Sequence, residues 1–154
     1  MFCPVLIELL EQGCTVGKSG KVFNSLAALS TRSNLETIHR LMLHLAPTRT
    51  LEVGFAFGGS ALVICAAHQE LGHAPEHQHV VIDPYQTSIW DSCGLVGLDR
   101  ASLSDFVDLH LVQSPLGQRL PVHAIIRTRR PATVRAVEVG QPINGPADGS
   151  SPVG

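Results

Sequence analysis

The sequence has few cysteines and lacks the pairings that would give them a structural role. Its four cysteines are scattered along 154 residues without a C-x-x-C pair. Neither a disulfide framework nor a zinc site is therefore predicted, and reduced thiols in the cytoplasm are expected. The first residues lack the basic segment of a signal peptide, and Glu8 interrupts their apolar run. No apolar stretch approaches the ~20 residues of a membrane span. We therefore expect one domain of a cytoplasmic protein.

Charge of one sign and aromatic residues are also scarce. The net charge is −2 at pH 7 and aromatic residues make up 5% of the chain, so neither nucleic acid nor a membrane is an expected partner. The one basic run, 127–130, has no interleaved aromatic residue, which makes it weak evidence for nucleic-acid binding. A small-molecule cofactor is the partner class that the rest of the sequence favours.

The stretch Thr50–Ser60, T-L-E-V-G-F-A-F-G-G-S, is the most informative part of the chain. Its first four residues predict a buried strand, which turns into a helix beginning near Gly58. Glycines at such a turn let the backbone pass close to a ligand. Glu52 is unusual, because a carboxylate in a buried strand is costly without a partner. A ligand carrying ammonium or hydroxyl groups at the carboxyl end of the strand would supply one.

Two cofactor classes use this strand–glycine–helix arrangement. The dinucleotide fingerprint G-x-G-x-x-G is met only loosely, by Gly54-x-Ala56-x-x-Gly59. A nicotinamide cofactor also has no need of an acid beside its phosphates, whereas S-adenosylmethionine has no phosphate and presents an ammonium and a sulfonium. Glu52 therefore favours S-adenosylmethionine, and an NAD-binding oxidoreductase fragment is the alternative.

A second acid follows a second apolar run. Val80–Ile82 predicts a strand buried on both faces, and it ends at Asp83. An acid in that position can hydrogen-bond the ribose diol of a nucleoside cofactor. A solvated turn aspartate is the other interpretation, since Asp-Pro is itself typical of turns. Glu52 in the neighbouring strand favours the first interpretation, with both carboxylates converging on one cofactor.

L-E-V-G-F-A-F-G-G-S-A-L and H-V-V-I-D-P-Y-Q resemble the first motif and the second strand of class I S-adenosylmethionine-dependent methyltransferases, in the branch that includes catechol O-methyltransferase-like enzymes. The resemblance runs from about the first helix to Ser114, with Ala56 standing where many members carry glycine. It implies an α/β fold: the first three parallel strands of a Rossmann-like methyltransferase domain with flanking helices, followed by an irregular C-terminal tail.

The resemblance also implies roles for six residues in binding S-adenosylmethionine. Glu52 would meet the methionine ammonium, directly or through a relay, and Ser60 would donate to the methionine carboxylate. Asp83 would hold the ribose. Gly54, Ala56 and Gly58 would leave room for the cofactor. No catalytic residue and no acceptor substrate can be assigned.

The remaining segments give weaker signals. A helix is expected over Val5–Gln12, a loop over Gly13–Asn24 that only mimics a phosphate-binding loop, a helix opened by the capping box Ser33–Glu36, a weak helix over Ser92–Leu103 and a half-exposed strand over Phe106–Val112. His68, His73, His77 and His79 are expected to be solvated, with no metal site. Tyr85 and Trp90 would flank an adenine ring or cover the edge of the sheet.

Beyond Pro115 the resemblance and the apolar periodicity stop. We expect residues 1–120 to form the N-terminal part of a methyltransferase domain and 121–154 to be a divergent, disordered tail with marginal strands at 124–126 and 133–139. The resembling family places its fourth strand beside the first, and no segment after Pro115 matches that fourth strand. We therefore expect a truncated member of the family with a foreign tail. Because its central strand would lack a neighbour, such a chain would be marginally stable, aggregate or self-associate through that strand. A non-catalytic remnant or interaction module is a further alternative.

Overall fold

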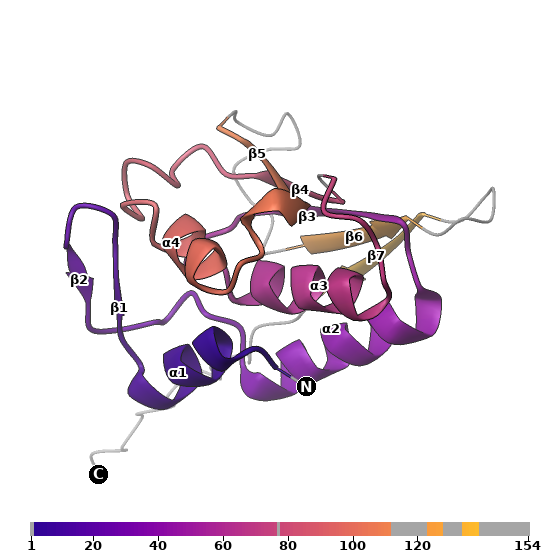
Figure 1. Ribbon diagram of the computed structural model, residues 1–154. Coiled ribbons are helices and arrows are strands. Elements are labelled where there is room, and N and C mark those ends of the chain that lie inside the picture. The colour runs from indigo at the N-terminus through magenta and orange to yellow at the C-terminus, as the bar shows by residue number, and fades with distance from the viewer. Residues whose placement is uncertain (1, 77, 112–122, 128–133, 139–154) are drawn as a thin grey trace, which may run out of the picture.

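The computed structural model describes residues 2–76, 78–111, 123–127 and 134–138 (Figure 1). In chain order the elements are α1 (Pro4–Gln12), β1 (Thr15–Val16), β2 (Val22–Phe23), α2 (Arg32–Leu45), β3 (Arg49–Val53), α3 (Gly59–Glu70), β4 (His79–Ile82), α4 (Cys93–Arg100), the 3-10 turn η1 (Ser104–Phe106), β5 (Val107–His110), β6 (His123–Arg127) and β7 (Val134–Glu138). Within these residues no helix is both long enough and apolar enough to cross a bilayer.

A five-stranded sheet organises the molecule, in the order β5-β4-β3-β6-β7. Strands β3, β4 and β5 run parallel, which confirms the predicted α/β class with three parallel strands. Strands β6 and β7 are antiparallel to their neighbours. They lie at the two short runs, 124–126 and 133–139, for which marginal strands were expected within the divergent tail. Because β3 pairs with β4 on one side and β6 on the other, the central strand is not unpaired.

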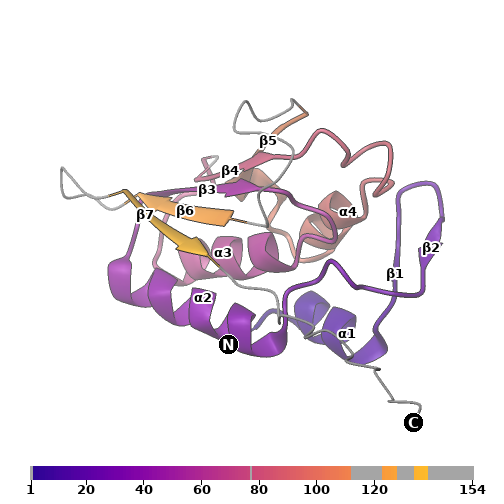
Figure 2. The same ribbon diagram turned by 180° about the vertical axis from the view of Figure 1, so that it is seen from behind.

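The described helices gather on one face of the sheet (Figures 1 and 2). Val81 faces them and is fully buried, whereas its neighbours Val80 and Ile82 point the other way and remain partly exposed. The expected burial of this strand on both faces was therefore wrong. The core lies between the sheet and the helices, and its fully buried side chains include Leu6, Leu35, Met42, Leu62, Ile64 and Leu98.

The start of α2 differs from the sequence prediction. Thr31 is the residue that caps the helix, and its hydroxyl accepts a hydrogen bond from the Asn34 N–H at 3.3 Å. The predicted capping box began at Ser33, whose carbonyl instead accepts from the Thr37 hydroxyl at 2.9 Å inside the helix. A threonine two positions earlier offers the same capping chemistry, so the helix gains an extra half-turn.

Candidate functional site

The turn between β3 and α3 is built on left-handed backbone. Gly54, Ala56 and Gly58 have φ angles of 86°, 46° and 76°. Ala56 is the unusual member, since residues with a Cβ seldom adopt that region. The Gly54 N–H donates to the Ile82 carbonyl at 2.9 Å, which continues the β3–β4 pairing into the turn. Helix α3 then begins at Gly59 with Gly58 as its cap, which confirms the predicted strand–turn–helix.

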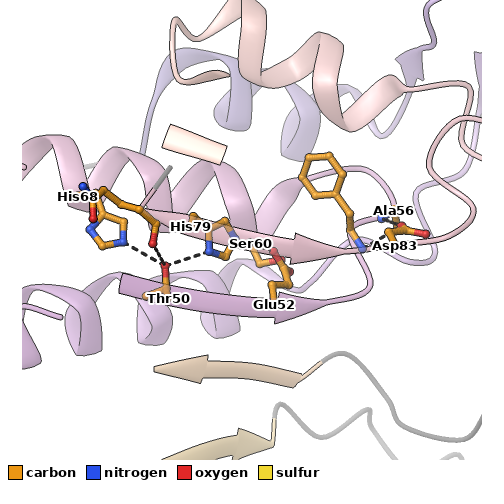
Figure 3. A network of polar contacts seen from close by, with 9 residues as sticks. Thr50, Glu52, Ala56, Ser60, His68, His79 and Asp83 are labelled. Atoms are coloured by element: carbon orange, nitrogen blue, oxygen red, sulfur yellow. Dashed lines mark hydrogen bonds and ion pairs between the residues drawn. The ribbon is translucent and has the colours of Figure 1, made fainter. Parts of the chain in front are cut away.

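Asp83 holds this turn from the end of β4. One carboxylate oxygen, Oδ2, accepts from the N–H groups of Phe55 and Ala56, each at 3.0 Å, and Oδ1 accepts from the Tyr85 N–H at 2.8 Å. The carboxylate is 3% exposed. The two sequence motifs therefore meet, as Figure 3 shows. Two charge-assisted bonds to adjacent amides offset the strain of the left-handed Ala56.

Glu52 lies on the same face of the sheet as Asp83. The parallel register pairs Glu52 with Val81, and alternate residues of a strand share a face, so residues 52, 81 and 83 all point toward the helices. Glu52 is fully buried and has partners inside the protein: Ser60 donates to its Oε1, and its Oε2 lies 3.1 Å from His79 Nε2. The partner expected in a ligand is thus supplied by the chain itself, and Ser60 links Glu52 to the first turn of α3.

Two histidines expected in solvent are fully buried. His68 on α3 and His79 on β4 have no exposed surface, and both contact the Thr50 hydroxyl, at 3.0 Å from His68 Nε2 and 2.9 Å from His79 Nδ1 (Figure 3). The expectation was therefore wrong for these two. Burial, with smaller contributions from His73 and His79, lowers the pKa of His68 to about 4, so His68 is neutral at pH 7.

The sequence carries a signal for the burial of these two histidines. His68 continues the helix face of Ala61, Ile64 and Cys65, all buried in the core, and His79 alternates with Val81 along β4. Within the residues that the structure describes, no group of three or more histidine, cysteine, aspartate or glutamate side chains could hold a metal ion. The buried imidazoles form hydrogen bonds with Thr50 and Glu52.

Gln86 is a site residue that the sequence reasoning missed. Its side chain is fully buried. With the amide oriented to suit its neighbours, the nitrogen donates to the Ala56 carbonyl at 3.1 Å and the oxygen accepts from the Gly94 N–H at 3.2 Å. Gln86 therefore ties the glycine turn to the first residues of α4. A glutamine three residues after the strand-end acid was the available signal.

The space beside Gly58 is occupied by the protein. A Cβ at this position would lie 3.0 Å from the Gly94 Cα and 3.2 Å from a ring carbon of Phe55. The sequence suggested that Gly58 leaves room for a cofactor. Its packing against Gly94 is sufficient to require glycine, whatever the turn binds.

A hairpin covers the turn from the side of the N-terminus. Strands β1 and β2 pair within the segment 13–24 that was expected to be loop. The Asp91 carboxylate ties this hairpin down, because Ser19 donates to it from its N–H at 3.0 Å and from its hydroxyl at 2.7 Å. These bonds lower the pKa of Asp91 below its ordinary value. A carboxylate in this position would repel a phosphate group.

Aromatic rings join the hairpin to the turn. Phe57 of the turn packs edge-on against Phe23 of β2, with ring centroids 5.7 Å apart, and against Trp90, at 5.0 Å. Tyr85 is 48% exposed. Trp90 therefore covers the turn, while the Tyr85 side chain is largely open to solvent.

Comparisons of the chain with protein-family models, with curated proteins and with solved structures found no match. The geometry of the turn and of its two acids therefore carries the functional argument.

Proposed function

We propose that this chain is the cofactor-binding half of an S-adenosylmethionine-dependent methyltransferase whose acceptor its residues do not specify. The main support is that Asp83 meets the Gly54–Gly58 turn at the carboxyl ends of β3 and β4. In open parallel sheets, ligands bind outside these ends, and an acid there can accept hydrogen bonds from a ribose diol. Methyl transfer from a sulfonium depends largely on positioning, which is what such a site provides.

Asp83 retains the capacity to bind a ribose. A carboxylate has about four acceptor positions, and three amides occupy Asp83 in the structure, two on Oδ2 and one on Oδ1. We assign the remaining position on Oδ1 to a ribose hydroxyl. Because the carboxylate is 3% exposed, its covering residues must move before a ligand can reach it.

The start of α3 would receive the methionine carboxylate of the cofactor. The first N–H groups of a helix lack intrahelical partners and carry the positive end of the helix dipole. Ser60 stands in this first turn, and its hydroxyl donates to Glu52. Backbone donors, with Ser60 held in place by Glu52, are therefore the groups we assign to the carboxylate. Glu52 becomes a positioning residue.

Calorimetric titration with S-adenosylmethionine and with S-adenosylhomocysteine tests this proposal. Asp83→Asn keeps an acceptor for the turn but removes the charge, and we expect it to weaken binding roughly 10- to 100-fold, the cost of a charge-assisted hydrogen bond. Glu52→Gln should weaken it less. Asp99→Asn, at an exposed position of α4, is the matched control and should bind normally. Unaltered affinity in both site variants would remove the basis of the assignment.

Titration with NAD and measurement of the melting temperature separate the alternatives. Binding of NAD with no heat from either sulfur ligand would favour a nicotinamide-binding fragment. A melting temperature that responds to neither class of ligand would favour a non-catalytic remnant or an interaction module.

A further inference from the structure

A continuous chain of hydrogen-bonding side chains runs through the core beneath the sheet. We call it the buried relay: His73, His68, Thr50, His79 and Glu52. His73 and His68 approach through their Nδ1 atoms at 2.8 Å, the Thr50 hydroxyl lies 3.0 Å from His68 Nε2 and 2.9 Å from His79 Nδ1, and His79 Nε2 lies 3.1 Å from Glu52. Figure 3 shows the four buried members one after another, with Ser60 beside Glu52.

The hydrogen atoms of the relay can be assigned from its carboxylate end. An ionised carboxylate only accepts, so His79 carries its proton on Nε2 and accepts from the Thr50 hydroxyl on Nδ1. The Thr50 oxygen then accepts from His68 Nε2. The hydroxyl could otherwise donate to the Gln78 carbonyl, but that contact is longer, at 3.4 Å.

The outer end follows the same logic. With its proton on Nε2, His68 accepts on Nδ1, so His73 donates from Nδ1. His68 carries one ring proton in this arrangement and is neutral, which agrees with the pKa of about 4 that burial gives it. All donors point from His73 toward Glu52, and each link is a heteroatom pair able to pass a proton.

We propose that the buried relay conducts a proton between the partly exposed His73 and the buried Glu52. A proton taken up at His73 Nε2 lets its Nδ1 proton pass to His68 Nδ1. His68 gives its Nε2 proton to the Thr50 oxygen, and Thr50 gives its own proton to His79 Nδ1. His79 then gives its Nε2 proton to Glu52. One proton crosses each hydrogen bond of the relay. The three imidazoles end neutral, each as its other tautomer, and the Glu52 carboxylate becomes a carboxylic acid.

The relay connects opposite ends of α3. Glu52 holds Ser60 in the first turn of the helix, beside the glycine turn, and His73 follows its last turn. A proton could thus reach the candidate site, or leave it, while the core stays closed. The nearby Cys65 thiol does not compete, because burial, Glu52 and Cys3 raise its pKa well above the usual value. The relay lies within the chain itself and does not require the proposed cofactor.

Exchange of the His79 ring proton with solvent tests the relay in the cofactor-free chain. NMR of ¹⁵N-histidine-labelled protein should find neutral Nε2–H tautomers at His68 and His79 and Nδ1–H at His73. We expect Thr50→Val to slow exchange of the His79 Nε2 proton about tenfold or more, and Thr50→Ser to restore it. Backbone amides of Glu52 and Val81 report opening of the core.

Two results would overturn the proposal. One is that, in the unaltered chain, the His79 Nε2 proton exchanges at the same rate as the Glu52 and Val81 backbone amides, which would mean that opening of the core alone accounts for the exchange. The other is an unchanged rate in Thr50→Val. Should Thr50→Val not fold, His73→Leu at the partly exposed end gives the same comparison, with His44→Leu on the surface as control. Equal rates in these two variants would also reject the relay.

Discussion

Acid should destabilise this protein through His68. Burial holds the pKa of this imidazole at about 4, against 6.5 in an exposed histidine. Below pH 6.5 His68 therefore binds a proton in the unfolded chain but not in the folded chain. The free energy of unfolding consequently falls until the pH reaches about 4. One pKa unit corresponds to about 1.4 kcal/mol, so the free energy of unfolding should drop by about 3 kcal/mol between pH 7 and pH 4 from this residue alone.

Urea unfolding followed by circular dichroism at a series of pH values measures this loss. Other groups also titrate in the interval, so the useful quantity is the difference between the unaltered chain and His68→Gln. The variant should be less stable at pH 7, and its deficit should shrink by about 3 kcal/mol at pH 4. His44→Gln, on the exposed face of α2, should follow the unaltered chain. A deficit for His68→Gln that is constant with pH would refute the reasoning.

Two further predictions concern the turn and its hairpin. Gly58→Ala should cost about 1–3 kcal/mol in urea unfolding, because φ is 76° and the new Cβ meets Gly94. Gly20→Ala, with φ of 90° but open space, should cost about 1 kcal/mol; equal costs would contradict the packing role of Gly58. Asp91→Asn should weaken the bonds from Ser19 and speed amide exchange in the hairpin relative to α3. Exchange at the original rate would show that the hairpin does not depend on them.

The parts of the fold that sequence predicted well are those with short-range causes. The turn from β3 into α3 requires left-handed residues within five positions, and the glycines at 54 and 58 indicate it. The signal for β4, a short apolar run followed by Asp83, also lies within a few neighbouring residues. That both features meet at one point also followed, because parallel strands present their carboxyl ends at the same edge of a sheet.

The parts that sequence missed depend on distant partners. Strands β1 and β2 have two residues each, too few for any periodicity, and the bond that fixes their hairpin joins Ser19 to a carboxylate 72 positions away. The short apolar runs that became β6 and β7 predicted strands, as found. These runs did not indicate that β6 pairs antiparallel with β3, because the partner and register of a strand depend on the tertiary structure against which it packs.

Glu52 shows why a site is harder to predict than a fold. A buried carboxylate requires a partner, and this requirement is a property of the residue alone. The identity of the partner is a property of the tertiary structure: Ser60 lies in the first turn of α3, and His79 lies on the neighbouring strand β4. The sequence alone does not distinguish a ligand from a histidine as the partner of this carboxylate. Asp83, with one acceptor position left after holding the turn, retains the acceptor that the proposed ribose contact requires. Substitution of Asp83 therefore discriminates a cofactor site from a packed turn more sharply than substitution of Glu52.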